Sequence, residues 1–340
     1  MIYTEQEILL LSVGALGLGM YLLFIGGDWT IDAAVYLAKK FGISPLVIGF
    51  TIVAFGTSLP ELLVSLNANM AGSPGIAIGN VIGSNIANIL LVVGVTAFFA
   101  TLYAVPSKIL RDSAMMMFAS ALMMGLMFYG AISQLGGTAM IVILLSYILW
   151  QYSMASKGKI EVDELDDPEY KNFLHGFLFL ILGLAAIAGG AEFLVRGAKV
   201  SATIIGVPED VIGLSVIAIG TSLPELSTCI IAAMKRQSDI IIGNILGSNV
   251  FNILMIIGAT AMVKPIANEA IAPQVLTLDI WVMFGVSLLF VLLLLFYKKI
   301  NKVIGGVFFT AYVFYIGLIY ALYLNKDVQE IAADAVGVAG

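Results

Sequence analysis

The sequence predicts an all-α membrane protein with ten transmembrane helices, arranged as two inverted five-helix repeats. Apolar residues make up 61% of its 340 residues and charged residues 11%, whereas soluble domains average about 45–50% and about 25%. The mean hydropathy is +1.05. Residues 48–99 recur, without a gap, as residues 212–263. These observations indicate a membrane protein built from two copies of one apolar unit.

Ten apolar segments of about 20 residues, the length that spans a bilayer, are expected to form the helices. Pro45 and Pro208 stand where the second and seventh spans begin, a position at which proline is tolerated. The spans lie near residues 7–27, 45–70, 76–100, 110–130, 136–154, 172–195, 209–234, 239–263, 274–297 and 302–324.

The most polar linker, residues 155–171, divides the ten spans into five and five. Because five is odd, the second copy must enter the membrane from the opposite side, which makes the repeats inverted. The expected units are a first repeat at 1–154, with its motif at 48–99, then the linker. A second repeat follows at 172–324, with its motif at 212–263, and a short C-terminal tail covers 325–340.

The distribution of basic residues predicts the orientation. Of the 16 lysine and arginine residues, most fall in loops on the side of the 155–171 linker, and basic loops are usually cytoplasmic. We therefore expect a multi-pass protein of the cell membrane with a cytoplasmic linker and with both termini outside.

The motif at the start of each copy carries a carboxylate inside an apolar stretch. It reads FGTSLPE at 55–61 and IGTSLPE at 219–225, so Glu61 and Glu225 correspond. An ionisable residue within a membrane span is costly and by default suggests a functional site. The proline before each glutamate frees a carbonyl of the preceding turn, near Gly56 and Gly220. In the bilayer such a carbonyl needs another partner.

The second part of each copy repeats this polar pattern without charge. Asn80, Ser84 and Asn88 recur every four residues, and so do their counterparts Asn244, Ser248 and Asn252, which gives each helix one polar edge. Carboxylates, hydroxyls, amide oxygens and freed carbonyls together form an all-oxygen ligand set, which hard cations such as Ca²⁺ prefer. Each hydroxyl or amide taken alone is equally compatible with helix packing.

The two copies resemble the alpha repeats of the calcium/cation antiporter superfamily, particularly its sodium/calcium exchangers. The matching signature, GTSLPE followed by GN-x-x-GSN-x-x-N, is present twice. The resemblance implies exchange of Ca²⁺ for Na⁺ by alternating access at one central site, with long spans 1 and 6 sliding across spans 2, 3, 7 and 8. The ligands it implies are Glu61, Glu225, Thr57, Ser58, Ser84, Asn88, Thr221, Ser222, Ser248 and Asn252, with the carbonyls of Ala54 and Ala218.

The chain departs from some members of that superfamily. Potassium-dependent members carry Asp where this chain has Asn252, and often where it has Asn88. The expected cage therefore holds two carboxylates, which argues against K⁺ cotransport. Proton-coupled members place a glutamate after the GN motif, where this chain has Gly83 and Gly247. A proton/calcium antiporter is thus the alternative to sodium coupling, and a cation channel with the same lining is a second one.

Other function classes have less support. The chain lacks HExxH and other catalytic constellations, so an enzyme is not expected. We expect no cofactor, no nucleic acid and no obligatory protein partner, with the bilayer as surroundings and Ca²⁺ and Na⁺ as transported ions. The single cysteine, Cys229, excludes internal disulfides. Glu192 and Arg196 are expected to pair along one helix, and Asp279 has no partner that the sequence identifies.

Overall fold

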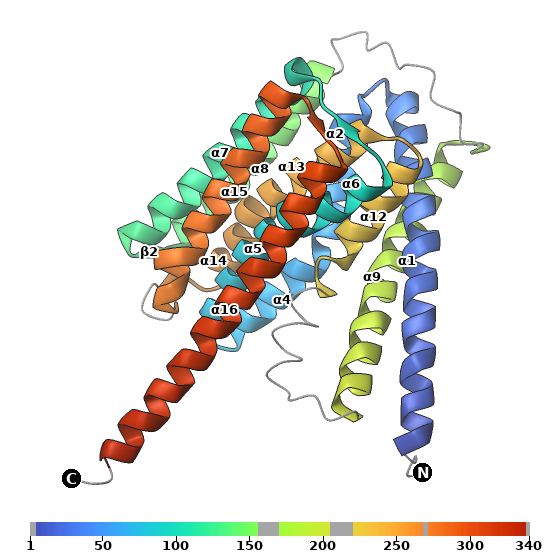
Figure 1. Ribbon diagram of the computed structural model, residues 1–340. Coiled ribbons are helices and arrows are strands. Elements are labelled where there is room, and N and C mark those ends of the chain that lie inside the picture. Colours follow the sequence, from blue (N-terminus) through green and yellow to red (C-terminus); the bar gives the residue numbers. More distant parts are fainter. Residues whose placement is uncertain (1–4, 156–169, 205–219, 268–270, 338–340) are drawn as a thin grey trace.

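The computed structural model describes residues 5–155, 170–204, 220–267 and 271–337, and helices dominate them (Figure 1). Eight of the described helices are long and apolar enough to cross a membrane. A ninth span results if the bent pair Pro45–Thr57 and Leu59–Met70 is counted as one. The start of the predicted seventh span, at 209–219, lies outside the described residues, so the total of ten stays a prediction.

The first half of the chain consists of helices joined by short turns. Its elements are α1 (Glu5–Phe41), α2 (Pro45–Ile48), a π-helical segment (Gly49–Val53), α3 (Ala54–Thr57), α4 (Leu59–Met70), α5 (Pro74–Ala87), a π-helical segment (Asn88–Val93), α6 (Gly94–Phe99), β1 (Leu102–Tyr103), α7 (Pro106–Tyr129), β2 (Ala131–Ile132) and α8 (Gln134–Ala155).

The second half repeats this order where it is described. Its elements are α9 (Phe173–Ile204), α12 (Leu223–Met234), α13 (Ser238–Phe251), a π-helical segment (Asn252–Ile257), α14 (Gly258–Val263), β3 (Ile266–Ala267), a π-helical segment (Val275–Asp279), α15 (Ile280–Leu292), a π-helical segment (Leu293–Tyr297), β4 (Lys299–Ile300) and α16 (Lys302–Gly337).

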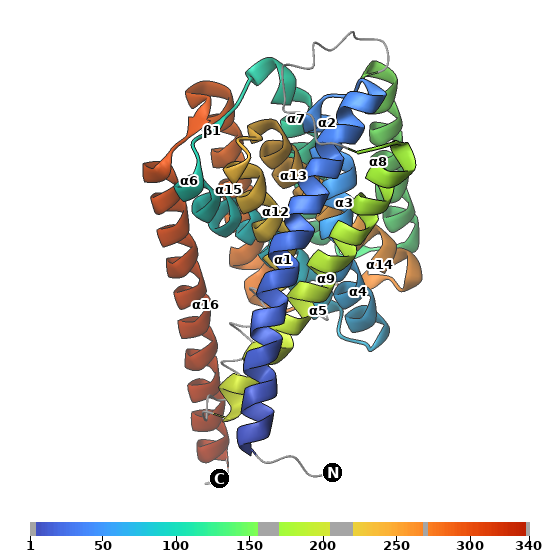
Figure 2. The same cartoon turned by 90° about the vertical axis from the view of Figure 1, so that its right-hand side faces the viewer.

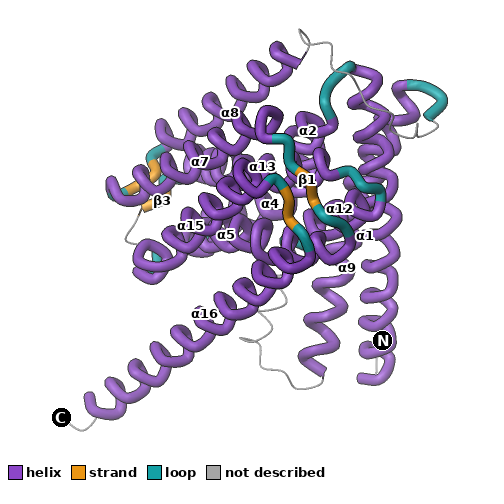
Figure 3. The backbone as a smooth tube through the Cα atoms, turned by 45° about the horizontal axis from the view of Figure 1, so that its top comes forward, coloured by secondary structure: helices purple, strands orange, loops and turns teal. Residues whose placement is uncertain are grey.

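Two short antiparallel strand pairs join the halves at opposite ends of the molecule. β1 pairs with β4, and β2 pairs with β3. Since β1 precedes α7 and β4 follows α15, while β2 follows α7 and β3 precedes α15, the helices α7 and α15 run in opposite directions (Figure 3). These two helices follow the first and second motif copies, so equivalent helices of the two halves are antiparallel.

α1 and α9 form a separate layer and pack along each other on one side of the molecule (Figure 2). Small residues permit the close approach. A Cβ added to Gly19 or Gly26 of α1 would lie 2.7 Å from the carbonyl oxygen of Gly190 or Gly183 of α9. The two helices continue past the predicted span ends at residues 27 and 195: α1 reaches Phe41 and α9 reaches Ile204.

A charged side chain connects α1 to the rest of the molecule. Lys235, which follows α12, lies 2.7 Å from an oxygen of Asp28 and 2.6 Å from one of Asp32, both on α1. The corresponding positions of α9 hold Glu192 and Arg196, whose exposed side chains pair with each other, as the sequence predicted.

The central helices of the core are α5 and α13. Every residue of α13 from Ile240 to Phe251 is buried. α13 packs against the second span through two glycines, because a Cβ at Gly243 or Gly247 would lie 2.2 Å from the carbonyl oxygen of Leu46 or Phe50. In contrast, many apolar side chains of the outer helices are exposed, Leu135 by 79% and Phe314 by 71% among them. This arrangement fits contact with lipid chains.

Candidate functional site

The two glutamates of the repeated motif follow two matching helix breaks. α3 ends at Thr57 and α4 begins at Leu59, with a bend of 45° between the helical segments. Ser58 at the break has φ −87° and ψ 3°, and Ser222, its counterpart before α12, has φ −88° and ψ 3°. Pro60 and Pro224 then stand in the first turn of the next helix, where proline is favoured. Glu61 and Glu225 therefore both lie in a first helical turn.

Both carboxylates are buried with an oxygen that nothing in the described chain satisfies. Glu61 and Glu225 are each 1% exposed. The Oε2 atom of each has no hydrogen-bond partner among the described residues. A buried carboxylate oxygen without a donor is costly in an apolar medium. Two of them at equivalent positions indicate a place for a cation.

Side chains of the two copies meet around these carboxylates. The Ser58 hydroxyl of the first copy donates to Oε1 of Glu225 in the second copy at 3.5 Å. Glu61 and Glu225 lie close enough to repel each other electrostatically. The duplicated motifs thus contribute to one shared site.

The polar edges of α5 and α13 supply amide oxygens. Asn88 and Asn252 each begin a π-helical segment, a local distortion that is frequent at functional sites. Each is 1% exposed. Their Nδ2 groups donate to Asn249 and Asn85, whereas their Oδ1 atoms have no donor within the part of the chain that the structure describes.

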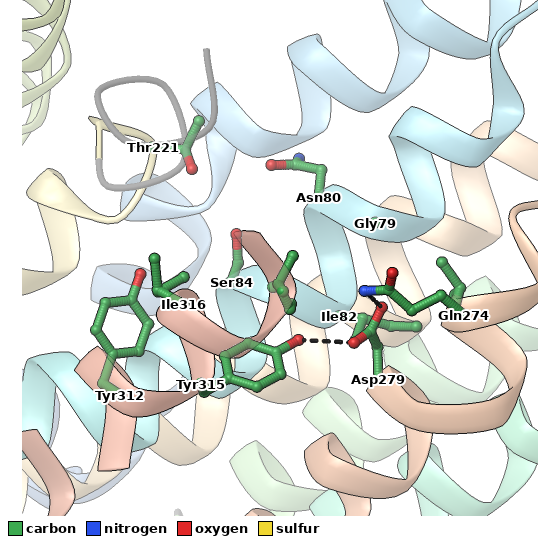
Figure 4. Close-up of a pocket in the computed structure, with 13 residues that line it drawn as sticks. Gly79, Asn80, Ile82, Ser84, Thr221, Gln274, Asp279, Tyr312, Tyr315 and Ile316 are labelled. Carbon is green, nitrogen blue, oxygen red and sulfur yellow. Dashed lines mark hydrogen bonds between the residues drawn. The ribbon is translucent and has the colours of Figure 1, made fainter. Parts of the chain in front are cut away.

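The remaining predicted ligands differ in whether they already have hydrogen-bond partners within the protein. The Ser222 hydroxyl is buried and has no partner among the residues described. The Ser248 hydroxyl donates to Asn244 at 3.4 Å. Ser84 and Thr221 line a common cavity (Figure 4). The Ala54 carbonyl accepts both the Thr57 hydroxyl, at 3.3 Å, and the Ser58 N–H, at 3.0 Å. Ala218 lies outside the described residues.

Two asparagines at the centre of this arrangement were not predicted. Asn85 and Asn249 follow the serine of each GSN motif and are 1% and 0% exposed. Asn85 donates to the main-chain oxygen of Asn249 at 3.4 Å. Asn85 accepts from the Asn252 amide and Asn249 from the Asn88 amide, so each holds an asparagine of the other copy. The sequence signal that could have identified them is that both copies of the GSN motif contain this asparagine.

The predicted ligand atoms are mainly neutral oxygens around two carboxylates. Within the described ranges, no group of three His, Cys, Asp or Glu side chains could hold a metal ion. A cation at this site would depend on hydroxyl, amide and main-chain oxygens for its other ligands. Na⁺ and Ca²⁺ accept such oxygen ligands, whereas softer metals prefer imidazole or thiolate.

The family model described as sodium/calcium exchanger protein matches residues 11–153 and 175–321 of the chain. The chain belongs to the sodium/calcium exchanger family. This is a family of cation/Ca²⁺ antiporters, and both motif copies, with their glutamates, fall within the matched ranges.

Relatives resemble nearly the whole chain. An uncharacterized membrane protein of Methanocaldococcus jannaschii is 33% identical over 307 residues, which cover 90% of this chain and 97% of that protein. The sodium/calcium exchanger MaX1 of Methanosarcina acetivorans is 30% identical over 341 residues, which cover 89% and 97%.

Solved structures of a family member have the same fold. The sodium-calcium exchanger NCX_Mj, soaked with zero Na⁺ and Ca²⁺, matches with a TM-score of 0.78 at 31% identity and covers 92% of this chain and 99% of its own. A structure of the sodium/calcium exchanger from Methanococcus jannaschii gives a TM-score of 0.76 at 31% identity, with 91% and 98% covered.

Proposed function

We propose that the chain is a secondary antiporter that exchanges Ca²⁺ for Na⁺ across the cell membrane. The observation that carries this proposal is the pair of buried carboxylates, Glu61 and Glu225, contributed by two copies of one motif, each with an oxygen that has no donor among the described residues. The names of the relatives support the choice of ions.

The proposed ligands combine charge with neutral oxygens. Glu61 and Glu225 bind the cation, and the other ligands complete its coordination. These are the side chains of Thr57, Ser58, Ser84, Asn88, Thr221, Ser222, Ser248 and Asn252, with the carbonyls of Ala54 and Ala218. The Ala54 carbonyl would exchange its bond from the Thr57 hydroxyl for the ion.

Exchange follows from electrostatics at a single site. Two carboxylates in an apolar medium need compensating positive charge. One Ca²⁺ supplies it, and so do Na⁺ ions in its place, but both cannot occupy the same oxygens. Without a bound cation the two buried carboxylates carry uncompensated charge, which is costly. The protein therefore changes conformation only when cations are bound. Alternating access at one site therefore couples the two ions.

The proposed topology has ten spans in two inverted repeats, a cytoplasmic 155–171 linker and external termini. The opposite directions of α7 and α15 support the inversion, and the concentration of basic residues near the linker supports the orientation. The site would lie near the bilayer midplane, where the antiparallel copies meet.

Transport into reconstituted vesicles tests the coupling. Vesicles loaded with Na⁺ should take up Ca²⁺ when diluted into Na⁺-free buffer, whereas vesicles loaded with K⁺ at the same ionic strength should not. Equal uptake driven by a pH gradient alone would favour the proton-coupled alternative. Uptake down a Ca²⁺ gradient without any counter-ion would instead indicate a channel.

A further inference from the structure

Two buried aspartates outside the repeated motifs occupy equivalent helices of the two halves. Asp112 lies near the start of α7, and Asp279 ends the π-helical segment that leads into α15. They are 3% and 8% exposed. Each accepts a hydrogen bond from a tyrosine of the following long helix, Asp112 from Tyr147 of α8 and Asp279 from Tyr315 of α16. The arrangement is therefore duplicated, although no motif in the sequence indicates it.

The two aspartates face opposite ends of the molecule. α7 and α15 run antiparallel, and each aspartate is near the start of its span. Asp112 consequently lies toward the end that carries β1–β4, and Asp279 toward the end that carries β2–β3. Among the described residues, each end of the protein thus has a buried aspartate near the start of an equivalent span.

The partners of Asp279 are neutral. The Tyr315 hydroxyl donates at 3.2 Å and the Gln274 amide at 3.5 Å. No lysine or arginine forms an ion pair with Asp279 within the described ranges. An acid at such a position in a membrane span is costly, and such residues typically mark ion pathways. The structure supplies donors that orient the carboxylate but no charge that compensates it.

A cavity connects Asp279 to the proposed exchange site. Its volume is about 290 Å³, and its lining includes Asp279 and Tyr315 at one side and Asn80, Ser84 and Thr221 at the other (Figure 4). Ser84 and Thr221 are among the proposed ion ligands. The cavity therefore brings the Asp279 carboxylate together with polar side chains that include two of the proposed ion ligands.

We propose that Asp279 forms a single-carboxylate cation site, where Na⁺ or Ca²⁺ pauses between the β2–β3 end of the molecule and the Glu61–Glu225 site. Asp112 is its counterpart for the path from the β1–β4 end. The inference rests on the proposed function, because alternating access requires a separate path from each end of the molecule to the ion site. Like Asp279, Asp112 is hydrogen-bonded by one tyrosine and one glutamine, Tyr147 and Gln151.

In this proposal Asp279 attracts cations through its charge, so its loss should change KM and leave the maximal rate unchanged. A carboxylate on the path raises the local cation concentration but does not contact the ion during the conformational change. Asp279→Asn should therefore raise KM for both ions about threefold to tenfold at one face, as expected for the loss of one focusing charge. The maximal rate and the KM at the other face should stay the same. Asp112→Asn should show the mirror-image pattern.

The test measures exchange from each face in vesicles of defined orientation. A structural role would give a different pattern: Tyr315→Phe, which removes the hydrogen bond to residue 279, would lower the maximal rate equally from the two faces, and Asp279→Asn, which keeps an acceptor for the Tyr315 hydroxyl, would have the smaller effect. In our proposal Tyr315→Phe retains the charge and has the smaller effect on KM. Unchanged KM values in Asp279→Asn, or equal changes at both faces, would overturn the proposal.

A binding measurement separates this inference from the proposed function. In the Glu61→Gln/Glu225→Gln double variant, equilibrium dialysis should detect weak residual Ca²⁺ binding, which adding Asp279→Asn should reduce. Thermal unfolding would show that both variants are folded. Absence of residual binding in the double variant would contradict an Asp279 site. Failure of Na⁺-driven uptake by the unsubstituted protein would contradict only the coupling.

Discussion

The Asn252 amide of the second copy donates to the Asn85 side-chain oxygen of the first copy at 3.0 Å. The reciprocal bond runs from Asn88 to Asn249 at 3.5 Å. Each copy therefore orients the ligand asparagine of the other. With Nδ2 occupied in this way, the Oδ1 atoms of Asn88 and Asn252 remain available to an ion.

This reciprocal pairing predicts the effect of removing Asn85. Asn85→Ala leaves the buried Asn252 amide without an acceptor, which should lower the free energy of unfolding by about 1–3 kcal/mol and weaken Ca²⁺ binding. Asn249→Ala should do the same through Asn88. Thermal unfolding in detergent and equilibrium dialysis measure the two effects. Asn67→Ala, at an exposed position, is the control, and an equal loss there would contradict a specific role.

The carboxylates are expected to be individually essential. Glu61→Gln and Glu225→Gln each keep the side-chain shape but remove one of two negative charges, so each should abolish Na⁺-driven Ca²⁺ uptake while membrane insertion persists. Glu192→Gln, at the exposed pair with Arg196, should transport normally. Normal uptake by both site variants would refute the ligand assignment.

Two corresponding glycines should respond differently to alanine. At Gly243 a Cβ would lie 2.2 Å from the Leu46 carbonyl oxygen, while at Gly79, its counterpart in the first copy, a Cβ would meet nothing within 4 Å. Gly243→Ala should destabilise the protein by about 1–3 kcal/mol. Gly79→Ala should be neutral or slightly stabilising, since alanine favours helix. Unfolding in detergent measures both, and equal effects would contradict the packing described.

The ion pairs of Lys235 should contribute modestly to stability. They are partly exposed, and such pairs are worth about 0–1 kcal/mol. Lys235→Met should lower the unfolding free energy by no more than this amount, with a smaller difference at high salt because ions screen the attraction. Lys264→Met, at an exposed position, should change nothing. A loss independent of salt would indicate that packing, not charge, connects Lys235 to α1.

The sequence predicted that the two motif copies meet, but it did not predict the contacts made by the side chains around them. Repetition of one motif identified Glu61 and Glu225 and, through the odd span count, their meeting at one place. The bond from Ser58 to Glu225 confirms that the copies meet. The Asp279–Tyr315 bond was not predictable, because it joins helices whose relative rotation depends on packing. Similarly, the contacts of Lys235 with Asp28 and Asp32 join α12 to α1 and depend on how these helices pack.

The two strand pairs have a consequence for assembly. β1–β4 and β2–β3 each take one strand from the first half and one from the second, at opposite ends of the molecule. Main-chain hydrogen bonds of these strand pairs thus connect the two halves at both ends, independently of the covalent linker. Two polypeptides, produced separately by cutting the gene within the linker, should therefore find each other in the membrane and reconstitute the intact transporter.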